Sequence, residues 1–193
     1  MATTDTTVPS SKRDQLMETA WTLFYRDGYR AVGIDALLAE AGVAKMTLYN
    51  HFPSKEALIV SVLEQRSGRL LAAMDHAVEA AGRSPTRRLL SVFEGLKQWF
   101  RTDDFKGCAF IRALSEYPEP DHPIHRAAWT HKRGVNSRLR ALAEEAGAKN
   151  PAALADSMSL LIDGAIVAAH ATRSDTPADT ARTAAQNLIK AQL

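Results

Sequence analysis

The sequence predicts an all-α fold. Ala and Leu are frequent, only 7% of the residues are aromatic, and few stretches show the alternation of a β-strand. Apolar residues instead recur at helical spacing, and a hydrophobic content of 46% in 193 residues can fill a sizeable core. About nine helices are expected, in an N-terminal unit (1–53) and a larger C-terminal bundle (54–193).

The N-terminal unit begins with a polar segment, residues 1–9, which is expected to be a disordered tail. Ser10 or Ser11 can then cap a helix that ends at Asp27-Gly28. Two short helices follow, over about 34–40 and 44–51. They are joined at Ala41-Gly42-Val43, where a glycine allows a sharp turn.

The C-terminal bundle starts after Phe52-Pro53, because a proline disfavours helical geometry at the residue before it. Ser54 caps a long helix that runs to about residue 81. Three further helices are expected where a capping residue precedes a proline at the first helical position. These pairs are Ser84-Pro85, Asn150-Pro151 and Thr176-Pro177; Asp121 opens another long helix, which ends near Gly147.

Composition points to a cytoplasmic protein without a membrane span. The opening residues MATTDTTVPSSKRD lack the apolar region of a secretory signal. The most apolar run, SLLIDGAIVAAHA, carries Asp163 and is too short to cross a bilayer. The single cysteine, Cys108, excludes an internal disulfide framework. The formal net charge of +2 says little about partners.

The two short helices have the layout of a helix-turn-helix, in which the second helix lies in the DNA major groove. At about 100° per residue, Leu48 and Phe52 fall on the face that meets the core. The outer face can donate to guanine, contact a thymine methyl group, or hydrogen-bond bases and phosphates. Its residues are Lys45, Met46, Thr47, Tyr49 and Asn50.

The run GYRAVGIDALLAEAGVAKMTLYNHFPSKEAL resembles the N-terminal domain of tetracycline-repressor-like (TetR) transcriptional regulators. The hallmarks are the A-G-V turn, L-Y-x-H-F and S-K-E-x-L, and they cover about the first sixty residues. The resemblance implies that the helix after the turn reads DNA, that Tyr49 and His51 touch the DNA backbone, and that Lys55 meets a phosphate. Gly33 and Met46 depart from the pattern, at a helix cap and on the reading face.

Charge alone would not identify this unit as a DNA binder, because up to Val60 it has six basic and seven acidic residues. Backbone N–H groups at helix starts and neutral hydroxyls also hold phosphates, however, and a dimer doubles every contact. A modest salt dependence is therefore expected, with specificity from shape and base edges.

The middle helices are expected to enclose a pocket for a mostly apolar small-molecule effector, since large apolar side chains concentrate there with scattered polar groups. The candidate lining is Phe93, Leu96, Trp99, Phe100, Cys108, Phe110, Leu114, His125, Trp129, Asn136 and Asp163. Each of these also has a structural interpretation, and Cys108 is favoured as a buried small hydrophobe.

Two C-terminal helices supply apolar stripes that fit the homodimer implied by the resemblance. The candidate interface residues are Leu154, Met158, Leu161, Ala165, Ile166, Ala169, Ala184 and Leu188. The whole chain is thus interpreted as a helix-turn-helix DNA-binding domain followed by an effector-binding and dimerisation bundle.

The function expected is that of a ligand-responsive DNA-binding regulator, most simply a repressor on a near-palindromic operator. A regulator without a small-molecule effector and a helical enzyme are the alternatives, although the sequence has no G-x-S-x-G, Walker A, H-E-x-x-H or dinucleotide fingerprint. No cofactor and no metal are expected, but His122, His125 and His131 leave a metal site open.

Overall fold

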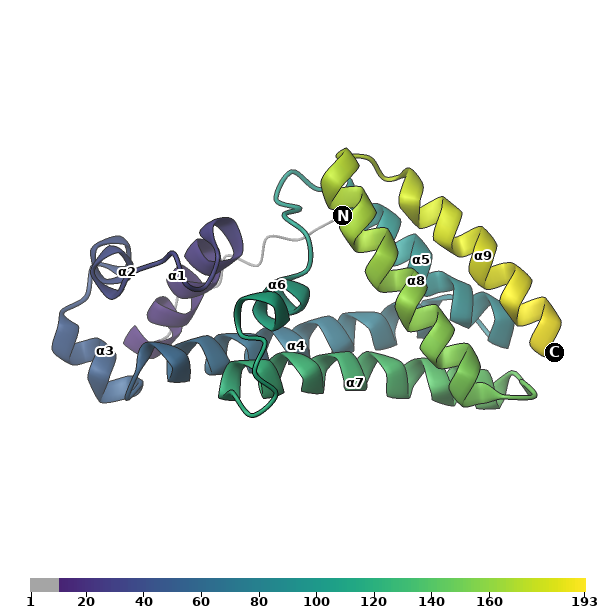
Figure 1. The fold of residues 1–193 in the computed structure, drawn as a ribbon, viewed down its shortest axis with the longest axis horizontal. Helices are drawn as coiled ribbons and strands as arrows, with labels where there is room; N and C mark the ends of the chain where they lie inside the picture. The colour runs from purple at the N-terminus through teal and green to yellow at the C-terminus, as the bar shows by residue number, and fades with distance from the viewer. Residues whose placement is uncertain (1–10) are drawn as a thin grey trace.

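The computed structural model describes residues 11–193 and confirms the all-α class within them (Figure 1). The helices of this part are α1 (Lys12–Asp27), α2 (Ile34–Ala41), α3 (Lys45–His51), α4 (Lys55–Ala80), α5 (Pro85–Phe100), α6 (Ala109–Glu116), α7 (Pro123–Glu145), α8 (Pro151–Thr172) and α9 (Thr176–Gln192). The expected tail and Ser10 lie outside the described residues.

Most helix starts use the caps that the sequence predicts. Ser11 Oγ accepts from the Asp14 N–H at 3.2 Å, and Ser54 Oγ accepts from the Ala57 N–H at 3.1 Å. Ser84 and Asn150 cap α5 and α8 in the same way. These side chains satisfy amide groups that have no partner inside the helix.

Two helix starts differ from the expectation by one residue. His122, not Asp121, caps α7, because Pro123 occupies the first helical turn and the residue directly before it takes the cap position. The His122 Nδ1 atom accepts from the Ile124 N–H at 3.2 Å. Thr176 already belongs to α9, whose N-cap is Asp175.

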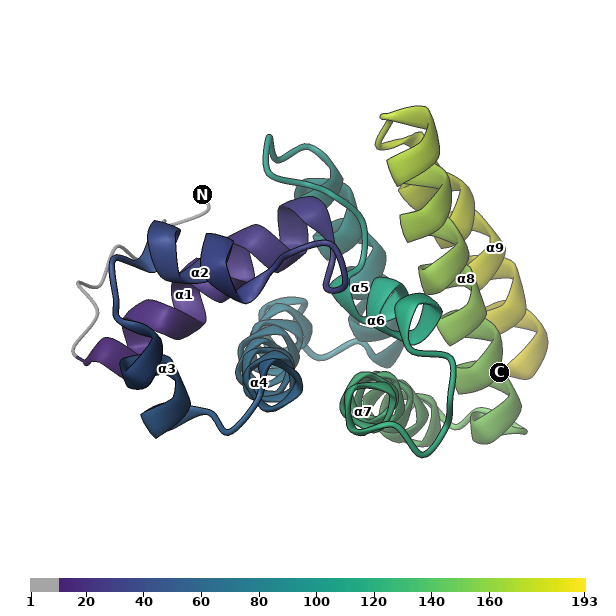
Figure 2. The same cartoon turned by 60° about the vertical axis from the view of Figure 1, so that its left-hand side comes forward.

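The helices lie in three groups along the longest axis of the molecule. Helices α1, α2 and α3 form one end, and α5, α8 and α9 form the other (Figure 1). The long helices α4 and α7 run side by side between them, and α6 lies between the two ends (Figure 2).

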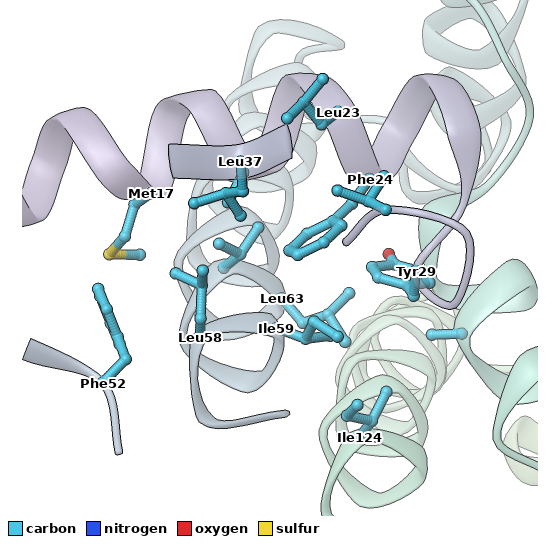
Figure 3. Packing of buried hydrophobic residues seen from close by; sticks show 14 of the residues in the cluster. Met17, Leu23, Phe24, Tyr29, Leu37, Phe52, Leu58, Ile59, Leu63 and Ile124 are labelled. Atoms are coloured by element: carbon cyan, nitrogen blue, oxygen red, sulfur yellow. The ribbon is translucent and has the colours of Figure 1, made fainter. Parts of the chain in front are cut away.

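The buried residues form two clusters. The first joins α1–α3 to the start of α4 and to α6 and α7, with Phe24, Tyr29, Leu37, Ile59 and Ile124 among its members (Figure 3). The second joins the end of α4 to α5, α7, α8 and α9. Helix α4 contributes to both clusters and so links the two ends of the molecule.

Helix α6 holds the loop between α1 and α2. The Glu116 carboxylate accepts from the Tyr29 and Arg30 N–H groups at 3.2 and 2.7 Å. Arg112 Nη1 donates to the Tyr25 carbonyl at 2.9 Å. Gly28 has φ 97°, and a Cβ there would lie 2.8 Å from Glu116 Oε1, so only glycine fits without a shift. The first three helices are thereby fastened to the bundle.

The apolar run in α8 is longer than expected from the sequence, so the expectation that it is too short to cross a bilayer is wrong. Helix α8 extends the apolar run to 22 residues, so within the described chain this one helix is long and apolar enough to cross a bilayer. Its Asp163 forms an ion pair with Lys132 of α7, and its buried residues belong to the second cluster. One face of α8 therefore belongs to the core.

Candidate DNA-binding face and effector cavity

The turn between α2 and α3 has the geometry that a helix-turn-helix needs. Gly42 adopts a left-handed conformation, φ 60° and ψ 37°, directly after α2. Leu48 and Phe52 are buried, as the periodicity predicts, and anchor α3 to α1 and α4 through the first cluster. Because these two side chains are buried, the orientation of α3 is set, and its opposite face points away from the core.

The residues expected to read DNA are mostly exposed on this outer face. Met46 is 71% exposed and Tyr49 is 42% exposed, although large apolar side chains are usually covered. Lys45, Asn50 and His51 are exposed as well, and Thr47 is half-buried. The face is thus mixed in character, with one cation, two aromatic rings and an amide.

Lys55 differs from this group. Its Nζ donates to the Arg30 carbonyl at 3.3 Å, and burial lowers the pKa of its ammonium group. The side chain therefore already joins the start of α4 to the α1–α2 loop. A phosphate contact by Lys55 would add to this bond or replace it.

Arg13 is a further candidate for this face that the sequence reasoning did not single out. It is exposed, and its guanidinium group lies 5.2 Å from the centre of the Phe52 ring, at the end of α3. A cation in the first turn of a helix opposes the helix dipole. The placement of Lys12 and Arg13 in the first turn of α1 is the sequence signal that makes them candidates for this face.

An open cavity of about 410 Å³ lies among α1, α4, α5, α6, α7 and α8, with the segment before α6. Four of the predicted pocket residues line it: Leu96, Trp99, Cys108 and Phe110. Much of the remaining lining is not among the predicted pocket residues and includes Trp21, Tyr25, Leu70, Leu71, Met74, Ser91, Val92, Gly95, Asp104, His131, Lys132, Val135 and Ile166. The walls are mostly apolar and aromatic.

Seven predicted pocket residues do not line this cavity. Phe93 and Phe100 are buried in the second cluster, and the His125 Nδ1 atom bonds to the Tyr117 carbonyl at 2.8 Å. The other four line a separate groove of about 560 Å³ between α7 and α8. They are Leu114, Trp129, Asn136 and Asp163.

The geometry of α7 explains the division between the two spaces. Trp129 and His131 are about 200° apart around a helix with about 100° per residue. Trp129 is 53% exposed, whereas His131 is buried and lines the cavity. Periodicity separates these two faces, but it does not say which face meets a cavity.

His131 is the most buried polar side chain of this cavity, with 7% of its surface exposed. Its ring stacks on Phe110 with 3.6 Å between centroids, and its Nδ1 atom lies 3.0 Å from Ser67 Oγ. Burial, with smaller contributions from the charges of Lys132 and Arg138, lowers its pKa from 6.5 to about 4. The imidazole is therefore neutral near pH 7.

The three histidines that left a metal site open have separate contacts. His122 caps α7 and stacks on Tyr117, His125 bonds to the Tyr117 carbonyl, and His131 stacks on Phe110. Within residues 11–193, no three His, Cys, Asp or Glu side chains are grouped so that they could hold a metal ion.

Most of the predicted dimer residues lie inside the subunit. Leu154, Met158, Ala165, Ile166 and Ala169 are buried in the second cluster, where a partner cannot reach them. Leu161 and Ala184 are half-buried, and Leu188 is exposed. The apolar stripe with helical spacing is the one that packs α8 against its own subunit.

Another stripe of α8 remains uncovered. Leu160 is 75% exposed and Val167 is 54% exposed, and Gly164 and Ala171 continue the same spacing. Helices α8 and α9 pack against each other along one side of the molecule (Figure 2). Leu188 of α9 is also exposed.

Comparison with known proteins supports both parts of the chain. Residues 16–62 match the family model described as bacterial regulatory proteins, tetR family, and residues 85–185 match the tetracyclin repressor-like C-terminal domain. The HTH-type transcriptional regulator YjdC of Escherichia coli (strain K12) is 23% identical over 179 residues, which cover 93% of this chain and 94% of YjdC.

Two solved structures are similar over nearly the whole length. The TetR-family transcriptional regulator SCO4454 from Streptomyces coelicolor is 30% identical with a TM-score of 0.87, covering 94% of this chain and 95% of SCO4454. The putative regulator sav143 from Streptomyces avermitilis is 34% identical with a TM-score of 0.78, covering 91% and 98%. The chain belongs to the TetR family of helix-turn-helix transcriptional regulators, which are not enzymes.

Proposed function

We propose that this protein is a cytoplasmic, homodimeric repressor that leaves its operator when a small, mostly apolar molecule occupies the cavity. The exposed outer face of α3, above the buried Leu48 and Phe52, is the observation that carries the DNA-binding part. Lys45, Met46, Thr47 and Asn50 read the major groove, while Tyr49, His51, Lys55 and Arg13 contact the backbone.

The dimer forms through the uncovered stripe of α8 and the neighbouring side of α9. Large exposed apolar side chains in a row are costly in water and are typical of subunit interfaces. A two-fold axis places the two α3 helices on one face, so the operator is a near-palindrome whose half-sites are separated by whole turns of DNA.

The reading face yields the first prediction. Replacing Met46 and Asn50 by alanine should change which bases are preferred at the operator, by about 1–3 kcal/mol for each lost base contact. Selection of binding sites from a random DNA pool, for the wild type and the double variant, measures this preference. The double variant Glu64→Ala, Gln65→Ala, on the neighbouring α4, serves as control. Identical preferences of wild type and reading-face variant would contradict the assignment.

The cavity supplies the effector site. An effector can release DNA only if it binds the released arrangement more tightly than the bound one. The long helix α4 lines the cavity with Leu70, Leu71 and Met74 and belongs to the first cluster through Leu58 and Ile59. A small pivot of α4 would change the spacing of the two reading helices.

The second prediction tests this site by filling it. Gly95 lies in α5 on the cavity wall, and a Cβ there meets nothing within 4 Å. Gly95→Leu should weaken binding of the neutral dye prodan by about 10-fold or more, because the new side chain occupies the cavity. Gly68 on α4 is equally open but lies outside the cavity lining. Gly68→Leu is therefore the matched control and should bind prodan normally.

Operator affinity, measured by fluorescence anisotropy, gives the second readout. Prodan should raise the melting temperature of the wild type and weaken operator binding in the same concentration range. Equal prodan affinity in the two leucine variants would contradict the location of the site. Stabilisation by prodan with no change in operator affinity would contradict release by this class of ligand.

A further inference from the structure

The cavity has a wall that comes from the DNA-binding end of the molecule. Trp21 and Tyr25 of α1 line it, one helical turn apart, with their rings stacked at 4.8 Å between centroids and 11° between planes. They belong to the helix that packs directly on α2 and α3. The effector space therefore touches the DNA-binding unit itself as well as the C-terminal bundle.

The Trp21 ring is held in place by neighbours on α1 and α4. The Arg66 guanidinium group lies 4.4 Å from the centre of the ring and also bonds to Glu18, one turn earlier on α1. Arg69 bonds to the other oxygen of Glu18 at 3.0 Å. An indole with a fixed position is suited to a binding wall, because little rotamer freedom is lost when a ligand packs on it.

Tyr25 is fixed from the other side. Its hydroxyl group donates to the Gly107 carbonyl and accepts from the Lys106 N–H, both at 3.0 Å. Burial raises the pKa of this phenol above its ordinary value. The stacked Trp21 and Tyr25 rings therefore contact α4 on one side, through Arg66, and the segment before α6 on the other, through Lys106 and Gly107.

The rest of the lining indicates the kind of ligand. Trp99 of α5 and the stacked Phe110 and His131 add aromatic surface to the other walls. The ammonium group of Lys132 is already paired with Asp163, and the imidazole of His131 is neutral. The lining also holds the exposed Asp104, whose carboxylate disfavours an anion. The mostly apolar and aromatic walls suit an uncharged, flat aromatic molecule with one hydrogen-bonding group.

We propose that Trp21 is an effector-contacting residue and that α1 forms one wall of the effector site. This inference rests on the proposed function, since it takes the cavity to be that site. A ligand that packs against Trp21 would act on the contact between α1 and α4. The ion pairs of Glu18 with Arg66 and Arg69 hold this contact. Occupancy would then reach α2 and α3 through their shared core as well as through a pivot of α4.

The test is prodan binding to Trp21→Ala, measured by the increase in dye fluorescence. Loss of the indole should weaken binding by about 10-fold or more, which corresponds to about 1.4 kcal/mol of lost contact. Thr22→Ala, at the next and exposed position of α1, is the matched control and should bind prodan as the wild type does. Equal affinity of the Trp21→Ala protein and the wild type would overturn the proposal.

Trp21→Phe covers the case in which the alanine variant does not fold, as judged by circular dichroism. Phenylalanine keeps a ring beside Arg66 but removes the larger indole, so prodan binding should still weaken, by about 3-fold or more. Unchanged binding in this folded variant would also overturn the proposal. If prodan binding depends on Trp21 while operator affinity never responds to prodan, the α1 wall is supported and the proposed release mechanism fails.

Discussion

Replacing both Leu160 and Val167 by glutamate should give a monomeric protein that binds its operator at least about 100-fold more weakly. These residues form the uncovered apolar stripe of α8, and two carboxylates from each subunit would face one another across the dimer axis. A monomer offers one reading helix to one half-site and loses the gain from simultaneous engagement of both.

Sedimentation gives the oligomeric state, and anisotropy on the selected operator gives the affinity. Ala72→Glu, Ala80→Glu adds the same two charges at exposed positions of α4 and should stay dimeric. Because both α8 positions are exposed in the subunit, the glutamate variant should keep its helical circular dichroism spectrum. A dimeric α8 variant with normal operator affinity would show that another surface forms the dimer.

The second large effect concerns pH and comes from His131. Its folded-state pKa of about 4 lies below the ordinary value of 6.5. Between these pH values the unfolded chain takes up a proton that the folded state does not. The free energy of unfolding should therefore decrease as the pH falls from about 6.5 to about 4, by up to about 3 kcal/mol in total. Below the folded-state pKa this loss is complete.

Urea unfolding of the wild type and of His131→Gln at several pH values isolates this contribution, because the effects of the carboxylates cancel in the difference. Glutamine does not titrate, so the stability of the variant relative to the wild type should improve as the pH falls. His76→Gln is the control, since the His76 side chain is 83% exposed and remains in water on folding. A stability difference between His131→Gln and wild type that is the same at pH 7 and pH 4.5 would contradict the burial argument.

Local chemistry explains why many elements could be predicted. Ser11, Ser54, Ser84 and Asn150 cap their helices because a side-chain oxygen satisfies an amide group three residues away, which is a short-range interaction. The two displaced starts have their N-caps at His122 and Asp175, each one residue from the expected cap. The spacing around Leu48 likewise determined which face of α3 is buried.

The sequence by itself therefore determined the helices, the helix-turn-helix and the faces of α3, because these depend on neighbours within one or two turns. Only the tertiary structure decided what each helix face packs against: the core, a cavity or the solvent. It buried the expected dimer stripe of α8 inside the subunit and placed Trp129 and His131 in different spaces. It also brought Tyr25 to Lys106 and Gly107, some 80 positions further along the chain. Helical periodicity states that a face is apolar, but a core, a cavity and a partner subunit all remove apolar surface from water, so the pattern alone does not distinguish them.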